Sequence, residues 1–333
     1  MSEDSRPLMV TIRCITYNHE PYIRQCLEGF VMQRTNFRFE AIVHDDASTD
    51  GTAGIIREYA EKYPDIIKPI YETENQYSKG GFPLLQKIMN DYTHGKYVSF
   101  CEGDDYWIDP LKLQKQVDFL EAHPNYGMCY TDFDIQDDTR HKYLKALFKN
   151  NPQKYPQKYT IEEWLTSRGY VAPMTWCINR DLWLTIPNIN SVDGTFVYFA
   201  HFLYSSRVYC LSDVTAVYRI AWGSATHFIS IEQGYNRLEG LHQVQLTLIK
   251  KYLPCDKCEK IQEEVDRYYY KVGLKIFVTL GLYDRVELAR KFFNGNTTLS
   301  QRILLNLPQS KITRIVLRFY YMCYLRFRKV FRR

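Results

Sequence analysis

Long apolar segments are missing from this chain of 333 residues. No stretch approaches the 18 or more uncharged apolar residues of a membrane-spanning helix. The nine cysteines are odd in number and follow no disulfide framework, which indicates reduced thiols and a cytoplasmic protein. The N-terminus carries Glu3 and Asp4 just before a strand-like segment, so we expect no signal peptide. The G-x-G-x-x-G and G-x-x-x-x-G-K-[ST] motifs do not occur, which speaks against a dinucleotide site or a P-loop.

Acidic residues are missing from the C-terminal segment. Residues 310–333 hold eight of the 43 Lys and Arg residues and none of the 38 Asp and Glu residues. The rest of the chain therefore has a slight excess of acid, which argues against a body that binds nucleic acid. Apolar residues recur near helical spacing between the cations of the segment, which predicts a basic amphipathic helix on an anionic membrane surface. The alternative is a helix packed on the body of the protein or on a partner subunit, and homo-oligomer formation stays open.

The composition is that of a globular protein, with 45% apolar and 24% charged residues. Over the first 134 residues, short apolar runs alternate with helical patterns, which predicts an α/β fold with a mostly parallel sheet flanked by helices. The expected strands cover residues 9–15, 39–44, 66–71, 97–101 and 126–133, and the expected helices cover 21–33, 51–63, 82–92 and a segment from 110.

The remaining chain divides into three parts. Residues 135–160 are polar and interrupted by proline, so we expect a mobile loop there. Residues 160–229 mix short strands and helices, including strands at 175–179 and 208–219, and the pattern from 230 onward is helical. We therefore expect an α/β domain at 1–229 that holds the binding and catalytic residues, and a helical C-terminal region at 230–333 that ends in the basic tail.

Two acidic clusters follow predicted strands directly, Asp45-Asp46 and Asp104-Asp105. Ligands of such sheets bind beyond the carboxyl ends of the strands, so both clusters should face one crevice. Unit charges ~4 Å apart interact by roughly 4 kcal/mol at an effective dielectric constant of 20, so carboxylates alone would repel an anionic ligand. A hard divalent cation, which favours carboxylate and phosphate oxygens, would reverse that repulsion.

Four fragments occur in order at the ends of predicted strands. They are Ile15-Thr16-Tyr17-Asn18, the segment 44–52 around Asp45-Asp46, the segment 102–107 around Asp104-Asp105, and Tyr218-Arg219. This order and spacing resembles the family 2 glycosyltransferases of GT-A fold over roughly residues 8–230. The resemblance implies a Rossmann-like, mostly parallel sheet flanked by helices, followed here by a helical C-terminal extension.

The resemblance also implies roles at the donor site. Asp105 would coordinate Mn²⁺ or Mg²⁺, and Asp104 would lie near the ribose of the donor. Asp46 would accept the N3–H of the base, while Thr16 and Tyr17 would bind the donor, with the ring of Tyr17 stacked on the base. The alternatives are a solvated acidic turn at 104–105, a core position for Tyr17, and a helix cap at 48–49 beside Asp46.

A catalytic base must be a carboxylate that can reach the acceptor hydroxyl. In the family this residue usually stands downstream of the metal motif, just before an amphipathic helix, which is where Asp193 lies. The family commonly has Gly or Glu before this residue, whereas this chain has Val192. A helix N-cap is the alternative role for Asp193, and Asp132 and Asp134 are competing candidates for the base.

Arg219 precedes a segment that corresponds to the loop that closes on the phosphates in the family. Its guanidinium could clamp a phosphate bidentately or form a structural ion pair. His227, in that segment, could touch the metal or a phosphate, or be a packed or solvated histidine. Trp107 could offer a flat ring to an acceptor sugar or pack in the core.

The resemblance thus implies an inverting glycosyltransferase of the hexosyltransferase type. It would move a sugar from a nucleotide-diphosphate donor, with a UDP-sugar favoured, to a hydroxyl of a glycan or lipid-linked acceptor in surface polysaccharide biosynthesis. Such an enzyme would be cytoplasmic and, through its tail, peripheral on the inner face of the cell membrane. The alternatives are a sugar-phosphate nucleotidylyltransferase and a catalytically silent module that binds nucleotides or sugars.

Overall fold

The structure is a computed structural model that describes residues 5–167, 170–189, 191–221, 230–293, 298–307 and 310–319. The chain divides into two compact units. The first comprises Met1–Tyr159, Gly169–Asn188 and His201–Ala221, and the second comprises Thr160–Arg168, Ile189–Ala200 and Trp222–Arg333. The expected boundary at residue 229 stays a prediction. The second unit also includes two segments that precede this residue, Thr160–Arg168 and Ile189–Ala200.

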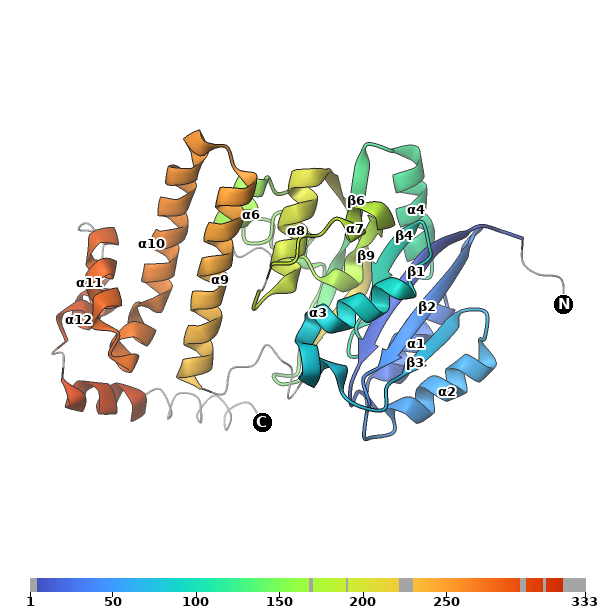
Figure 1. The fold of residues 1–333 in the computed structure, drawn as a ribbon, viewed down its shortest axis with the longest axis horizontal. Helices are drawn as coiled ribbons and strands as arrows, with labels where there is room; N and C mark the ends of the chain where they lie inside the picture. Colours follow the sequence, from blue (N-terminus) through green and yellow to red (C-terminus); the bar gives the residue numbers. More distant parts are fainter. Residues whose placement is uncertain are drawn as a thin grey trace. The chain divides into compact units, whose positions relative to one another are not determined.

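A mixed sheet forms the first unit (Figure 1). Its strand order is β3 (Ile67–Tyr71), β2 (Arg38–Asp45), β1 (Leu8–Thr16), β4 (Tyr97–Phe100), β8 (Cys177–Asn179), β6 (Tyr126–Asp137), β9 (Arg207–Ile220) and β5 (Tyr106–Trp107). The β3–β2–β1–β4 block and the long β6–β9 pairing are parallel, whereas β8 and β5 pair antiparallel. The α/β fold with a largely parallel sheet and flanking helices is therefore confirmed.

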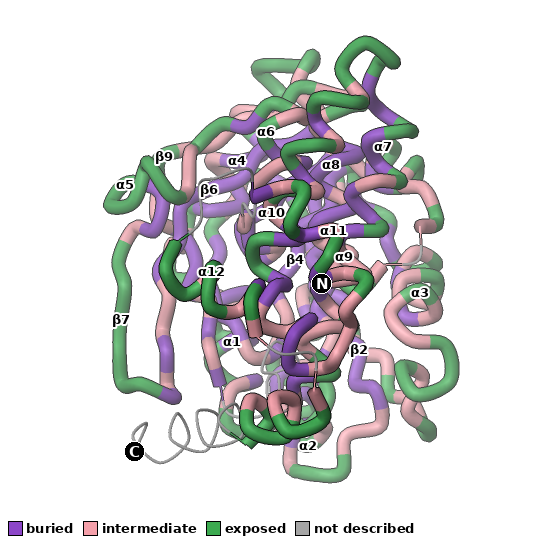
Figure 2. The backbone as a smooth tube through the Cα atoms, turned by 90° about the vertical axis from the view of Figure 1, so that its left-hand side faces the viewer, coloured by how far each residue is buried: buried purple, intermediate pink, exposed green. Residues whose placement is uncertain are grey.

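The central strands are buried because the sheet is covered on both faces. All four residues of β4 are buried, and so are residues 10–14 of β1, among them the polar Thr11 and Arg13 (Figure 2). The helices of this unit are α1 (Ile23–Val31), α2 (Thr52–Lys62), α3 (Gln76–Asp91), α4 (Lys112–Ala122), α5 (Leu147–Asn150) and α7 (Arg180–Leu184), with a short 3₁₀ turn at Pro173–Thr175.

Helix α3 begins earlier than the sequence pattern predicted. Asn75 caps it by accepting a hydrogen bond from the amide of Ser78 at 2.7 Å. The helix is broken at Gly81, whose φ of 62° is a left-handed value that glycine adopts readily. Pro83 follows the break, and the expected helix from residue 82 is the second half of α3.

The expected loop at 135–160 is interrupted by regular structure at 135–137, 142–144 and 147–150. Strand β6 runs on to Asp137 and pairs antiparallel with β7 (Lys142–Leu144), and α5 follows. The cause is a set of carboxylates that bind backbone amides. Asp132 accepts from Phe133, Phe148 and Lys149 at 2.8–3.0 Å, and Asp134 accepts from Ala146 at 2.8 Å.

The second unit is helical. It contains α6 (Ile161–Thr166), α9 (Ile231–Tyr252), α10 (Cys255–Leu280), α11 (Tyr283–Phe292), α12 (Leu299–Asn306) and a helical segment at 311–319, while α8 (Gly194–Ser205) runs from the second unit into the first. Capping boxes begin α6, α9 and α12. A buried cluster joins α9–α12 through Leu238, Tyr269, Tyr270, Leu274, Phe277, Val278, Val286, Ala289, Phe293 and Leu305.

In the part of the chain that the structure describes, no helix combines the length and the apolar character needed to cross a membrane.

Candidate active site

The carboxyl ends of β1, β2 and β4 are joined by backbone hydrogen bonds in the first unit. The amide of Asp46 donates to the carbonyl of Thr16 at 3.0 Å, and the amide of Gly103 donates to the carbonyl of Ile15 at 3.1 Å. A β-carbon on Gly103 would lie 2.7 Å from Thr16 Oγ1, so only glycine permits this approach. Three of the four predicted fragments therefore lie together at one edge of the sheet.

The segment after β1 is held against the segment after β2. Asn18 has a left-handed φ of 53°, its amide donates to Ser48 Oγ at 2.9 Å, and its side-chain oxygen accepts from the amide of Thr49 at 2.8 Å. Thr16 is buried, whereas Tyr17 is 45% exposed. The core alternative for Tyr17 is therefore wrong, and its ring is available for stacking.

Asp46 lies buried beneath the start of α3. Its two carboxylate oxygens accept the amide hydrogens of Gln76 at 2.6 Å and Tyr77 at 3.0 Å. A negative charge at a helix N-terminus is favourable because the first amides have no partner within the helix. Each oxygen keeps a second lone pair, so these bonds leave room for the predicted base contact.

The expected helix cap at Ser48 or Thr49 is wrong. The N-cap of α2 is Gly51, which offers no side chain. Instead, Asp50 Oδ1 accepts from the amide of Thr52 at 3.0 Å and from its hydroxyl at 2.6 Å. Ser48 donates its hydroxyl to Asp45 and so rigidifies the turn after β2.

Three carboxylates crowd the turn after β4. Asp105 is buried, and burial followed by the charge of Asp104 raises its pKa well above the usual range. Burial and the same neighbour raise the pKa of Glu102 to about 8. One backbone amide, that of Arg219, donates to Asp105 Oδ1 at 2.8 Å. Ionisation of these carboxyls is therefore unfavourable without an added cation, at the place where the sequence predicts the metal.

Arg219 links this turn to two other segments. Its Nε donates to the carbonyl of Asp104 at 2.9 Å, and its two Nη groups donate to Asp138 at 3.1 Å and Gln25 at 2.6 Å. The guanidinium also lies about 5 Å from the ring centroids of Tyr22 and Tyr106. The structural ion pair is therefore present, and three of the five N–H donors are used, which leaves two for a phosphate.

His19 belongs to the same edge and was missed by the sequence analysis. Its pKa is lowered by burial, against the opposing influence of Asp104, Asp50 and Asp45. His19 directly follows Asn18, the last residue of the first fragment, and this position was the only sign of a site role in the sequence. Gln25 and Asp138 were missed because nothing in the sequence marks them as partners of Arg219.

The remaining predicted residues fall elsewhere. Asp193 lies in the second unit, where its Oδ1 accepts from the amide of Phe196 at 3.1 Å at the start of α8, so the contact expected of a helix N-cap is present. Asp132 and Asp134 are tied to backbone amides, as described above, which assigns them a structural role. Trp107 is 2% exposed and donates to the carbonyl of Met174, so the core alternative holds for its ring. His227 lies outside the described residues.

The donor set fits a divalent cation shared with a substrate. Among the described residues, no group of three or more His, Cys, Asp and Glu side chains could hold a metal ion. Protein sites for Mg²⁺ with nucleotides often use one or two carboxylates, and phosphates and waters complete the shell. Asp105, with Asp104 beside it, matches that pattern of hard oxygen donors.

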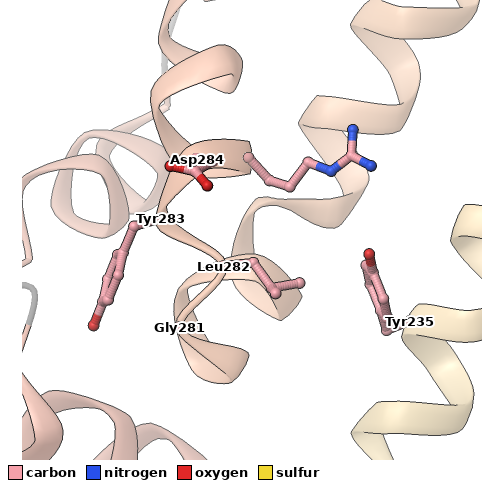
Figure 3. Close-up of a pocket in the computed structure, with 6 residues that line it drawn as sticks. Tyr235, Gly281, Leu282, Tyr283 and Asp284 are labelled. Carbon is pink, nitrogen blue, oxygen red and sulfur yellow. The ribbon is translucent and has the colours of Figure 1, made fainter.

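A pocket of about 350 Å³ lies in the second unit, away from all the predicted residues in sequence (Figure 3). Its lining consists of Tyr235, Gly281, Leu282, Tyr283, Asp284 and Arg285. The side chain of Leu282 points toward Tyr235 in the close-up (Figure 3). Arg285 pairs with Glu239 at 3.1 Å, so the cation of this pocket is already neutralised.

Comparison with known proteins gives consistent matches. The family model "Glycosyl transferase family 2" matches residues 11–183. An uncharacterized protein of Mycobacterium tuberculosis is 47% identical over 121 residues, which is 36% of this chain and about a third (34%) of that protein's length. The putative teichuronic acid biosynthesis glycosyltransferase TuaG of Bacillus subtilis is 25% identical over 254 residues, which covers 72% of this chain and 92% of TuaG.

Two solved structures share the fold. TarS residues 1–349 of S. aureus, in complex with UDP-GlcNAc, match with a TM-score of 0.61 at 19% identity and cover 96% of this chain and 92% of that one. The mannosyltransferase PcManGT of Pyrobaculum calidifontis, in complex with GDP-Man and Mn²⁺, matches with a TM-score of 0.56 at 18% identity and covers 98% and 87%.

Proposed function

Because the chain belongs to glycosyl transferase family 2, we propose that it is an inverting glycosyltransferase that uses a nucleotide-diphosphate sugar. The observation that carries the proposal is the convergence of the ends of β1, β2, β4 and β9 around Asp104-Asp105. The donor is proposed to be a UDP-sugar, since the TarS neighbour was solved with UDP-GlcNAc. A role in surface polysaccharide biosynthesis is supported by the name of TuaG.

The donor site is proposed to use the residues at this edge. Tyr17 stacks on the base, Asp46 accepts its N3–H, Thr16 binds the donor, and Asp104 lies near the ribose. The two remaining N–H donors of Arg219 are proposed to bind a phosphate of the donor.

A divalent cation, Mn²⁺ or Mg²⁺, is proposed to bind Asp105. The raised pKa of this carboxyl supports the proposal, because a cation would relieve the crowding of negative charge around it. The Mn²⁺ in the PcManGT structure points the same way. When bound, such a cation neutralises charge on the diphosphate. A contribution from His227 stays a prediction.

Asp193 is proposed to be the general base. Its carboxylate takes the proton of the acceptor hydroxyl as the acceptor oxygen forms a bond to the anomeric carbon. The bond from that carbon to the diphosphate breaks, and the diphosphate leaves with the electron pair. The acceptor is proposed to be a glycan or lipid-linked hydroxyl.

A peripheral position on the cytoplasmic face of a membrane is proposed for the C-terminal tail. In the helical segment 311–319, four apolar side chains at i, i+3, i+4 and i+7 are 57–74% exposed: Ile312, Ile315, Val316 and Phe319. Cations flank them at Lys311, Arg314 and Arg318, of which Arg318 pairs with Glu232 at 3.5 Å. An anionic leaflet attracts a Lys or Arg near its surface by about 1 kcal/mol.

The tail is tested by sedimentation with phospholipid vesicles. We expect the full chain to pellet with vesicles that contain phosphatidylserine, to pellet much less with phosphatidylcholine alone, and to be released by salt. Deletion of residues 309–333 should abolish pelleting. Equal partitioning of both proteins would contradict the proposal, and a concentration-dependent dimer lost on deletion would assign the apolar face to a second copy instead.

The activity is tested with a panel of UDP-GlcNAc, UDP-glucose and GDP-mannose in the presence of Mn²⁺. Release of the nucleoside diphosphate, stimulated by an acceptor glycan, is the expected result. Binding of a donor without any release would favour the silent binding module. Formation of a nucleotide sugar from a sugar phosphate would favour a nucleotidylyltransferase.

A further inference from the structure

Helix α9 holds the segment that carries Asp193. Arg237 Nη2 donates to Asp193 Oδ2 at 2.8 Å, and Arg237 Nη1 donates to the carbonyl of Val192 at 3.2 Å. One guanidinium therefore donates hydrogen bonds both to the carboxylate and to the backbone carbonyl just before it. The other oxygen of Asp193 accepts from the amide of Phe196, so both ends of the carboxylate are fixed.

A glycine brings α9 close enough for this contact. Gly240 lies one turn after Arg237 on the same helix, and a β-carbon there would stand 2.6 Å from Val192 Cγ1. Glycine inside a helix costs about 1 kcal/mol relative to alanine, so its presence needs a local reason. The close approach to Val192 supplies that reason.

The far side of the same segment is also anchored. Trp164 Nε1 donates to the carbonyl of Phe196 at 3.0 Å, and the two rings stack with centroids 5.3 Å apart. The first turn of α8 is thus held by α6 on one side, while α9 holds the carboxylate that precedes it.

Stability alone gives little reason for the Arg237–Asp193 pair. The two side chains are 35% and 27% exposed, and exposed ion pairs contribute about 0–1 kcal/mol. The position of the carboxylate can have a larger effect on the reaction rate, because a displacement of about 1 Å at a reacting group can cost about 10²-fold in rate. An ionised carboxylate has about four lone-pair sites, and the two described bonds leave two for an acceptor hydroxyl.

We propose that Arg237 is a positioning residue that orients Asp193 for proton abstraction, with Gly240 as the residue that lets α9 reach it. The proposal rests on the proposed function, in which Asp193 is the general base. It extends the catalytic machinery into α9, which the sequence analysis had assigned to the C-terminal helical region.

The test compares Arg237→Gln and Arg237→Lys with Arg285→Gln. The control pair Arg285–Glu239 also involves α9 and has similar exposure, 34% and 22%. Turnover is measured as UDP release from the UDP-sugar selected in the panel, with acceptor and Mn²⁺. We expect Arg237→Gln to lower kcat about 10–100-fold with the KM of the donor unchanged. Arg237→Lys should recover part of the loss, and Arg285→Gln should keep normal kcat.

A double variant identifies the path of the effect. If Arg237 acts through Asp193, Asp193→Asn combined with Arg237→Gln should be no slower than Asp193→Asn alone. Additive losses would overturn the proposal, as would an equal loss in Arg285→Gln or a melting temperature that falls in step with kcat.

Failure of the two proposals can be told apart. A slow Asp193→Asn with a normal Arg237→Gln refutes the positioning role and leaves the base in place. Normal turnover in Asp193→Asn refutes the base itself, and with it the positioning role.

Discussion

A buried lysine under the proposed metal turn makes the stability of this protein depend on pH. Lys112, at the start of α4, is fully buried, and its Nζ donates to Gln116 Oε1 at 2.7 Å. The ammonium also lies 4.1 Å from the ring centroid of Trp107, two residues after Asp105. Burial lowers the pKa of Lys112 from 10.5 to about 8.

The sign of the effect follows from the direction of the shift. Between pH 8 and 10.5 the unfolded chain holds a proton on Lys112 that the folded chain has released, so stability rises with pH over this window. At 1.36 kcal/mol for each pKa unit, the buried charge costs about 3 kcal/mol below pH 8. For a domain of about 150–250 residues, such as the first unit, this free energy corresponds to roughly 6–12 °C in melting temperature.

The assay compares the wild type with Lys112→Met by thermal melting from pH 7.5 to 10.5. Methionine has a similar length and no proton to lose, so the melting temperature of the wild type minus that of the variant should rise by roughly 6–12 °C across the range. Other titrating groups are common to both proteins and cancel in the difference. Lys115→Met is the control, because ion pairs with Asp109 and Asp213 raise the pKa of Lys115, so its difference should stay flat up to pH 10.5. A flat difference for Lys112 as well would refute the reasoning.

Three further predictions concern the active site. Asp105→Asn should lower turnover by at least about 10²-fold and weaken the Mn²⁺ dependence of UDP binding, and near-normal turnover with unchanged metal dependence would exclude the metal role. Tyr17→Ala should weaken UDP affinity by about 5–100-fold in calorimetry, since stacking on a base contributes about 1–3 kcal/mol, while the melting temperature stays the same because the ring is exposed. Arg219→Gln should lower both the melting temperature and the UDP affinity, because Arg219 is a buried link between segments. The control Arg140→Gln, whose partner Asp137 is 3.6 Å away, should change neither. Larger losses in Arg140→Gln than in Arg219→Gln would contradict this role of Arg219.

Sequence patterns predicted the main strands of the first unit because burial on both faces leaves short, mostly apolar segments, as in β1 and β4. The site edge followed from the same strands, since ligand residues stand where parallel strands end. The two-residue β5 was not predictable, because so short a strand has no period. The elements β7 and α5 within 135–160 were missed because, at three and four residues, they are too short to show a period.

Long-range partners escaped the sequence analysis for a different reason. Arg219 is linked to Gln25 across 194 positions and to Asp138 across 81 positions, and no local pattern records such contacts. Trp107 follows the acidic turn directly, yet its ring is buried against Phe30, with centroids 5.2 Å apart. Neighbouring residues in one motif can thus serve the site and the core separately.

The acids of this chain show how folding separates site carboxylates from structural ones. In sequence, Asp132 and Asp105 look alike, since each stands within or just after a buried strand. In the fold, Asp132 accepts three backbone amides, which satisfy its charge and order the loop after β6. Asp105 accepts one, and burial, followed by the charges of Asp104 and Glu102, raises its pKa. A buried carboxylate that the protein leaves unneutralised destabilises the fold unless a ligand supplies the missing positive charge. Asp46 lies between these cases, because two amides hold it at the start of α3 and its remaining lone pairs stay open to a base.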